Sequence, residues 1–188
     1  MPEEQMNSAN RPTSLDGRTY HVETKWGEVS NRIITVGDPQ RAHAISQHLD
    51  TILMTKQSHR GFLTITGLYK QLPVSIVAIG MGSPMMDFFV RETRMVVDGP
   101  LAIIRFGSCG SIISGAQTGD FIIGDGAFGI TRNYAYFDDA SEKDAYVLWP
   151  NVDADTLLTE GVVNEMVQGV GAQRVFRGLV GNADSFYG

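Results

Sequence analysis

Short apolar runs alternate with amphipathic segments along most of the chain. Runs rich in β-branched and other apolar residues predict strands at 32–36, 61–68, 74–79, 101–106, 120–123 and 175–180. Apolar positions at helical spacing predict helices over 40–49, 85–97 and 153–168. Strands that alternate with helices are typical of βαβ units. We therefore expect an α/β fold in which a central, mixed and mostly parallel β-sheet is flanked by helices.

The first 19 residues break this pattern. They are polar, with Pro, Ser and Asn at intervals, which predicts a flexible N-terminal segment over 1–19 and a single domain over 20–188. The segment lacks the apolar centre of a signal peptide, and the single cysteine, Cys109, excludes an internal disulfide framework. Both features favour a cytoplasmic protein.

Composition and charge narrow the classes of partner. No apolar run approaches the roughly 20 residues of a membrane span, so no membrane partner is expected. The net charge of −6 argues against a nucleic-acid binder, which usually carries a basic excess. An anionic small molecule stays compatible with this charge, because a few arginines in one pocket are enough to bind it.

Three of the predicted strands run into glycine-bearing loops, at Gly37, Gly80 and Gly107. In α/β folds the ligand site lies at the carboxyl ends of the strands, so we expect these loops to converge on one pocket. The sequence contains neither a G-x-x-x-x-G-K-[ST] phosphate loop nor a dinucleotide G-x-G-x-x-G motif after a strand. Nucleoside triphosphates and NAD are therefore disfavoured as ligands.

Arginines accompany two of these loops. Gly37 permits close approach of a ligand to the backbone, and Arg41 lies in the first turn of the following helix, whose free N–H groups attract anions. Arg105 lies in an apolar run, where a lone guanidinium is costly to bury, and Ser108 follows it with a hydroxyl and an N–H group. A phosphate would satisfy all of these groups. Two alternatives stay open: a solvated arginine at position 41, and a buried carboxylate partner for the arginine at position 105.

Other reactive side chains are weaker candidates. Arg60 is a third candidate phosphate contact, the alternative being an edge-strand arginine in water. His21, taken alone, is interpreted as a surface histidine. Cys109 has no histidine beside it in the sequence, so a small packing residue is favoured over a nucleophile. The acidic loop at 138–142 lacks the spacing of metal ligands, and no metal site is expected.

Six segments share their order and similar spacing with one known family. They are 36–41 (VGDPQR), 58–62 (SHRGF), 80–84 (GMGSP), 104–111 (IRFGSCGS), 119–120 (GD) and 183–187 (ADSFY). Through them the chain, over about residues 20–188, resembles the trimer- and hexamer-forming class of nucleoside phosphorylases. That class contains uridine phosphorylases and bacterial-type purine nucleoside phosphorylases, and the last segment is most similar to the uridine type.

The resemblance implies a pentosyltransferase that performs reversible phosphorolysis of a nucleoside, with uridine favoured, to free base and ribose 1-phosphate in nucleoside salvage. Inorganic phosphate would be the co-substrate, and no metal or organic cofactor is implied. The phosphate site would consist of Gly37, Arg41, Arg60, Arg105 and Ser108, with Arg41 and Arg105 as the catalytic residues.

The resemblance also implies active sites that are shared between subunits. Arg60 would reach the phosphate of the neighbouring subunit, and His21 would reach its ribose 5′-hydroxyl, so we expect a homodimer or a higher homo-oligomer. Cys109, Gly110 and Phe186 would lie beside the nucleoside substrate.

Two departures from the family keep alternatives open. Gly61 stands where many bacterial uridine phosphorylases have a glutamate that binds a monovalent cation between subunits, which puts that cation site in question. The chain ends at Gly188, before the family's base-reading and ribose-gripping residues, with roughly two thirds of the usual domain. The alternatives are a purine nucleoside phosphorylase, a nucleosidase that uses water and would lack the three arginines, and a truncated non-catalytic phosphate-binding subunit or fragment.

Overall fold

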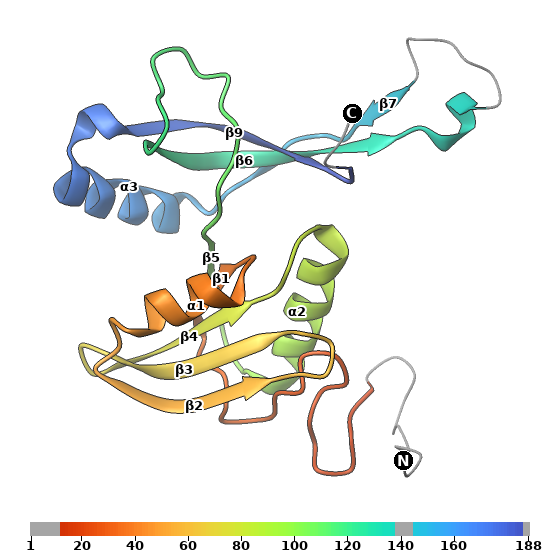
Figure 1. The fold of residues 1–188 in the computed structure, drawn as a ribbon, viewed down its shortest axis with the longest axis vertical. Coiled ribbons are helices and arrows are strands. Elements are labelled where there is room, and N and C mark those ends of the chain that lie inside the picture. Colours follow the sequence, from red (N-terminus) through yellow and green to blue (C-terminus); the bar gives the residue numbers. More distant parts are fainter. Residues whose placement is uncertain (1–11, 138–144, 186–188) are drawn as a thin grey trace. The chain divides into compact units, whose positions relative to one another are not determined.

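The computed structural model describes residues 12–137 and 145–185. The chain divides into two compact units, Met1–Ser108 and Cys109–Gly188, and each unit has a sheet of its own. Figure 1 labels the elements of both units. All five candidate phosphate contacts belong to the first unit, which is therefore described first.

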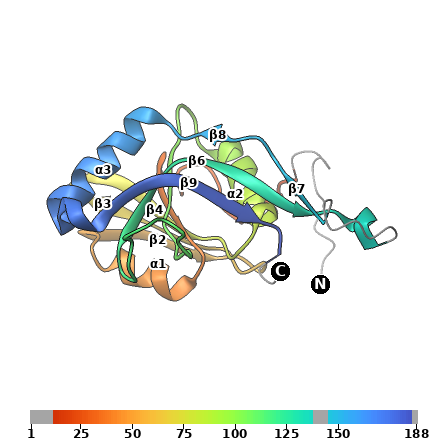
Figure 2. The ribbon, with the colours of Figure 1, turned by 90° about the horizontal axis from the view of Figure 1, so that it is seen from above.

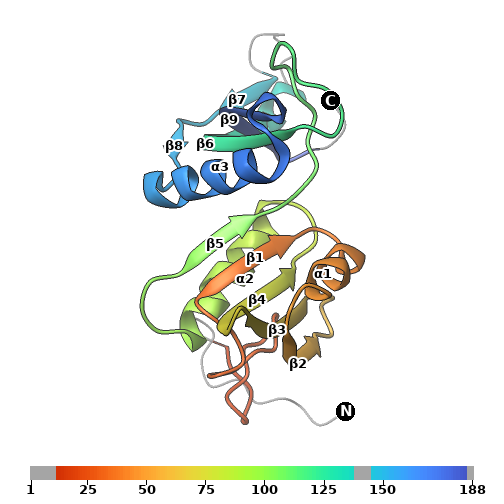
Figure 3. The same ribbon diagram turned by 90° about the vertical axis from the view of Figure 1, so that its left-hand side faces the viewer.

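Five strands and two helices build the first unit. They are β1 (Arg32–Val36), β2 (Thr51–Gln57), β3 (Leu63–Tyr69), β4 (Leu72–Ala78), β5 (Ala102–Arg105), α1 (Pro39–Ser46) and α2 (Ser83–Val96). The strands follow the order β2-β3-β4-β1-β5 across the sheet, as Figure 3 shows. β1 runs parallel to both of its neighbours, β4 and β5, whereas β2, β3 and β4 pair antiparallel. The sheet is therefore mixed, with its parallel part at β4-β1-β5.

The two faces of this sheet carry separate hydrophobic clusters. Along β1, Ile33 belongs to one cluster and Val36 to the other, because successive side chains of a strand point to opposite faces. Phe89 of α2 joins the Ile33 cluster, and Ala42 of α1 joins the Val36 cluster. Both of these helix residues are fully buried. Each helix therefore covers one face, and the first unit has three layers, helix, sheet and helix.

The second unit is built around one long strand. Its elements are β6 (Phe121–Arg132), η1 (Tyr134–Phe137), β7 (Tyr146–Leu148), β8 (Val152–Asp153), α3 (Thr156–Val170), η3 (Ala172–Arg174) and β9 (Val175–Ala183). β6 pairs antiparallel with β7 and β8, and parallel with β9. α3 precedes β9 and packs along β6 and β9, as Figure 2 shows. This arrangement is the helical crossover that a parallel strand pair requires.

The predicted fold class is confirmed, since the chain is an α/β protein with mixed sheets flanked by helices. The boundaries differ from those predicted. The strand predicted at 120–123 continues to Arg132, and the helix predicted at 40–49 ends at Ser46. Beyond Ser46 the N–H groups of His48 and Leu49 close single turns onto the carbonyls of Ile45 and Ser46, which ends the regular helix. The seven-residue strand β2 and the short strands β7 and β8 were not predicted.

Part of the predicted flexible N-terminal segment makes ordered contacts. Arg18 donates two hydrogen bonds of 2.6 Å to the carboxylate of Glu28, and Thr19 is buried. Residues 1–11 lie outside the described residues. The domain boundary at residue 20 therefore stays a prediction.

Candidate functional site

The carboxyl ends of β1, β4 and β5 meet at one edge of the first sheet. Register sets this edge, because Thr35 of β1 lies opposite Val77 of β4 on one side and Arg105 of β5 on the other. The ladder continues into the loops, where the N–H of Ile79 donates to Val36 and the N–H of Phe106 donates to Thr35, at 2.9 and 2.8 Å. The three glycine-bearing loops therefore begin side by side, as the sequence predicts.

Arg105 joins the three loops. Its Nη2 atom donates to the carbonyl oxygen of Gly80 at 3.2 Å. A Cβ atom added at Gly37 would lie 3.4 Å from that same nitrogen and 3.5 Å from the Gly80 oxygen. Because glycine has no side chain, the guanidinium and the backbone of both loops come together at this edge.

Arg41 approaches the same place from α1. Asp38 caps this helix by accepting a hydrogen bond of 2.7 Å from the N–H of Gln40, and Pro39 begins the first turn, which contains Arg41. Desolvation, followed by repulsion from the nearby Arg41, lowers the pKa of Arg105. The two positive charges therefore lie close enough to oppose each other, as they would at a site for an anion.

Neither guanidinium pairs with a carboxylate among the described residues of the first unit. The alternative of a carboxylate partner for Arg105 is therefore not seen in this part of the chain. The expectation that Arg105 is buried is wrong. It is the last residue of the four-residue β5 and its side chain is exposed, since the strand ends there and the chain leaves the sheet.

The candidate site residues in the loop after β5, which are Ser108, Cys109 and Gly110, are exposed. Ser108 is the last residue of the first unit, while Cys109 and Gly110 begin the second unit. Cys109 is an exposed free cysteine, so its interpretation as a packing residue is wrong. Phe186 and the acidic loop at 138–142 lie outside the described residues.

Arg60 lies at the same sheet edge, next to β3, which is two strands away from β1 and three strands away from β5. It belongs to the turn between β2 and β3, which closes through a hydrogen bond of 3.0 Å from Gly61 N–H to the carbonyl of Ser58. Leu63, which begins β3, pairs with Ala78 at the end of β4, and this register sets the turn on the edge. The guanidinium of Arg60 has no hydrogen-bond or ion-pair partner in the part of the chain that the structure describes.

His21 is held by a buried glutamate of α2. The carboxylate of Glu92, 4% exposed, accepts hydrogen bonds from the N–H groups of His21 and Val22 and contacts Nδ1 of the His21 ring. The ring also lies against Phe88, with 4.2 Å between ring centroids. His21 is thus fixed on the first unit, which differs from the interpretation of an ordinary surface histidine.

Glu92 has a function in this arrangement that the sequence analysis missed, as does Glu23, which contacts the turn carrying Arg60. Their partners lie 71 and 36 residues away in the sequence. Local spacing therefore contained no signal for either contact.

The described residues add two negative observations. No three His, Cys, Asp or Glu side chains within 12–137 and 145–185 gather in a way that would hold a metal ion. None of the helices in those ranges combines the length and the apolar composition that crossing a membrane requires.

Known proteins are similar to this chain in sequence and in fold. The uridine phosphorylase of Thermococcus kodakarensis is 32% identical over 184 residues, which are 98% of this chain and 62% of that protein. A DeoD-type purine nucleoside phosphorylase of Photorhabdus laumondii is 34% identical over 110 residues, which are 58% of this chain and 45% of that protein. The chain thus spans less than two thirds of the length of these curated relatives.

A solved structure from a study of two uridine phosphorylases of the oomycete Phytophthora capsici has the same fold. It superposes with a TM-score of 0.88 at 40% identity, over 97% of this chain and 69% of that one. The family model described as "Phosphorylase superfamily" matches residues 31–188, most of the chain, and includes the three loops at the sheet edge. On this match the chain belongs to the phosphorylase superfamily.

Proposed function

We propose that this protein catalyses the reversible phosphorolysis of a nucleoside, with uridine favoured, to free base and ribose 1-phosphate. The observation that carries the proposal is the pair of guanidinium groups of Arg41 and Arg105, which lie beside Gly37 at the carboxyl ends of the parallel strands β1, β4 and β5. Neither has a carboxylate partner among the described residues of the first unit. The relatives from Thermococcus kodakarensis and Phytophthora capsici, which are named uridine phosphorylases, support the choice of uridine.

The chemistry of this site follows from charge. Cleavage of the bond between ribose and base develops positive charge on the ribose, and a phosphate dianion below the ribose C1′ stabilises that charge and then attacks. Arg41, Arg105, Ser108 and the backbone at Gly37 would hold and orient the dianion. The rate enhancement would come mainly from positioning and from electrostatic stabilisation of the transition state. This scheme needs phosphate as co-substrate and no further cofactor.

Further residues are proposed to complete the active site. Arg60 and His21 would come from a neighbouring subunit, so that the active enzyme is a homodimer or a higher homo-oligomer. Arg60 supports this view, because it lies next to β3, two strands from β1 and three from β5, and its guanidinium is unpaired among the described residues. Cys109, Gly110 and Phe186 would lie beside the nucleoside. The single cysteine supports a cytoplasmic location.

A purine nucleoside is the second candidate substrate. The observation that favours it is the 34% identity with a DeoD-type purine nucleoside phosphorylase over a 110-residue stretch. The phosphate site would serve both substrates in the same way, because the base leaves from the opposite side of the ribose. The choice between uridine and a purine nucleoside therefore depends on residues other than the phosphate contacts Arg41 and Arg105.

The experiment is base release from uridine and from inosine by the purified protein, with and without inorganic phosphate. The proposal predicts uracil and ribose 1-phosphate only when phosphate is present, with uridine the better substrate. Faster release from inosine would assign the purine activity, and release without phosphate would assign a nucleosidase. A protein that binds phosphate but releases neither base would be the non-catalytic subunit.

A further inference from the structure

Glu23 has a backbone conformation that is unfavourable for its residue type. Its φ is 58°, in the left-handed region that glycine occupies without strain. A non-glycine residue persists in such a conformation only when its surroundings hold it there. The side chain of Glu23 should therefore make contacts that a glycine would lose.

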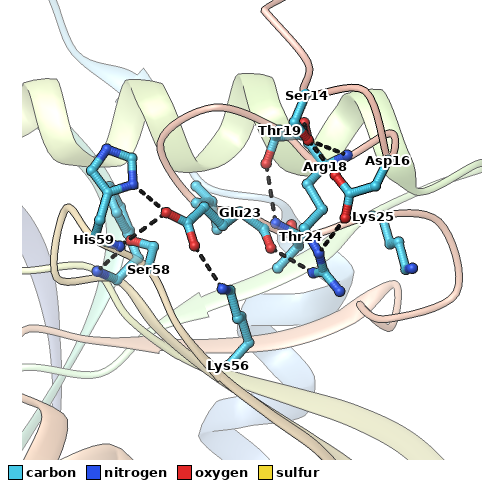
Figure 4. Close-up of polar contacts among 12 residues, drawn as sticks. Ser14, Asp16, Arg18, Thr19, Glu23, Thr24, Lys25, Lys56, Ser58 and His59 are labelled. Carbon is cyan, nitrogen blue, oxygen red and sulfur yellow. Dashed lines mark hydrogen bonds and ion pairs between the residues drawn. The ribbon is translucent and has the colours of Figure 1, made fainter. Parts of the chain in front are cut away.

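Those contacts all lead to the end of the β2–β3 hairpin. The Glu23 carboxylate, 19% exposed, accepts a hydrogen bond from Lys56 Nζ at 2.7 Å and from the N–H of His59 at 3.0 Å. It also contacts Nδ1 of the His59 ring. Figure 4 shows Glu23 between Lys56 and His59, with its two oxygens directed to different partners. One carboxylate thus fixes both the last part of β2 and the turn that follows.

This contact joins two segments that carry proposed site residues. His59 immediately precedes Arg60 in the turn, and Glu23 follows His21 by two residues. Tyr20 completes the connection, because its ring lies edge-on to the rings of both His21 and His59, at 5.0 and 5.9 Å between centroids. The N-terminal segment and the turn therefore pack against each other.

The charge of Glu23 persists over the physiological range. Burial alone would raise its pKa, but the hydrogen bond from Lys56 and those from His59 outweigh this effect and lower the pKa to about 2. The carboxylate is therefore ionised near neutral pH.

We propose that Glu23 is a positioning residue that locks the Arg60 turn to the His21 segment, so that both side chains are presented together to the active site of a neighbouring subunit. This inference rests on the proposed function, because it assigns Glu23 an effect through Arg60 and His21. Glu23 itself touches no substrate. Its strained backbone is maintained because a glycine would leave the turn unattached.

The kinetic test compares Glu23→Gly with the wild type and with Glu28→Gln. Glu28 holds Arg18 in the same segment without contacting the turn, so it is the matched control. Glu23→Gly should raise KM for phosphate about tenfold, because Arg60 is no longer held in place, with a smaller effect on kcat. Glu28→Gln should leave KM for phosphate within about twofold of the wild type.

A double substitution separates positioning from general damage to the fold. If Glu23 acts through Arg60, then adding Glu23→Gly to Arg60→Ala should cause no further rise in KM for phosphate. Additive effects of the two substitutions, or a fall in kcat at constant KM, would overturn the inference.

Backbone amide exchange provides a readout that needs no activity. Glu23→Gly should speed exchange at His59 and Arg60 and leave exchange at Ile79 and Phe106 unchanged. If no base is released but exchange changes in this way, the proposed function fails while the lock itself stands. Unchanged exchange at His59 and Arg60 would overturn the lock whatever the activity.

Discussion

In the first unit, three glutamates have defined partners, whereas two arginines have no carboxylate partner among the described residues. Three glutamates of this unit each hold a defined partner: Glu28 holds Arg18, Glu23 holds Lys56 and His59, and the buried Glu92 holds the backbone at His21. The arginines at positions 41 and 105 have no such acid among the described residues of their unit. Structural ion pairs and unpaired cations thus lie on different segments of the first unit. The unpaired cations are the ones available to an anionic substrate.

The pKa of Glu23 leads to a prediction for stability against pH. Its folded pKa of about 2 lies below the ordinary value of 4.5, so the ionised side chain stabilises the fold above pH 4.5. This contribution, on the order of 2 kcal/mol, is lost as the pH falls from about 4.5 towards 2. Urea unfolding of the wild type and of Glu23→Gln should therefore differ at pH 7 and converge near pH 2. A difference that is independent of pH would contradict the assignment.

The sequence was sufficient to predict candidate site residues that lie close together along the chain. Gly37 and Arg41 follow one strand within five positions, so the strand–loop–helix pattern was enough to group them. Glu23 and Glu92 act on partners 36 and 71 positions away, and only the folded chain brings them together. The exposure of Arg105 was also missed, because an apolar run does not reveal where its strand ends.

At the level of elements, glycines explain why β6 was predicted too short. A glycine normally weakens a strand, and the run after residue 123 contains Gly124, Gly126 and Gly129. In the structure the strand continues because its neighbours approach closely there. A Cβ added at Gly126 would lie 2.8 Å from the carbonyl oxygen of Val152 in β8. Gly126 is thus required by the close pairing of β6 with β8.

Helix α2 anchors the N-terminal segment through Glu92. Glu92→Ala would leave the buried N–H groups of His21 and Val22 without their acceptor, at a cost of about 3 kcal/mol. We expect faster proteolysis within 19–24 and a lower Tm than the wild type. As a control, Asp87→Ala removes an exposed ion pair with Arg91 on the same helix and should change the Tm little. Equal effects of the two substitutions would argue against the anchor.

At the level of the whole molecule, the two units differ in their buried residues and in the proposed site residues that they carry. Among the described residues, every buried hydrophobic side chain belongs to the first unit, which folds around the two clusters that flank its sheet. The proposed phosphate contacts lie in this unit, whereas Cys109, Gly110 and Phe186, proposed beside the nucleoside, belong to the second. Phosphate binding is therefore the part of the proposed activity that depends on residues of the first unit.

The most direct test of the account is titration of the 188-residue chain with inorganic phosphate by calorimetry, at an ionic strength held constant with chloride. If Arg41 and Arg105 hold phosphate, binding should be saturable. Arg41→Gln and Arg105→Gln should each weaken it by about tenfold or more, because each removes a charged hydrogen-bond donor. Arg91→Gln, which alters an exposed arginine of α2 already paired with Asp87, should bind as the wild type does. Absence of saturable binding, or equal affinity in Arg105→Gln and Arg91→Gln, would contradict a phosphate site at this edge.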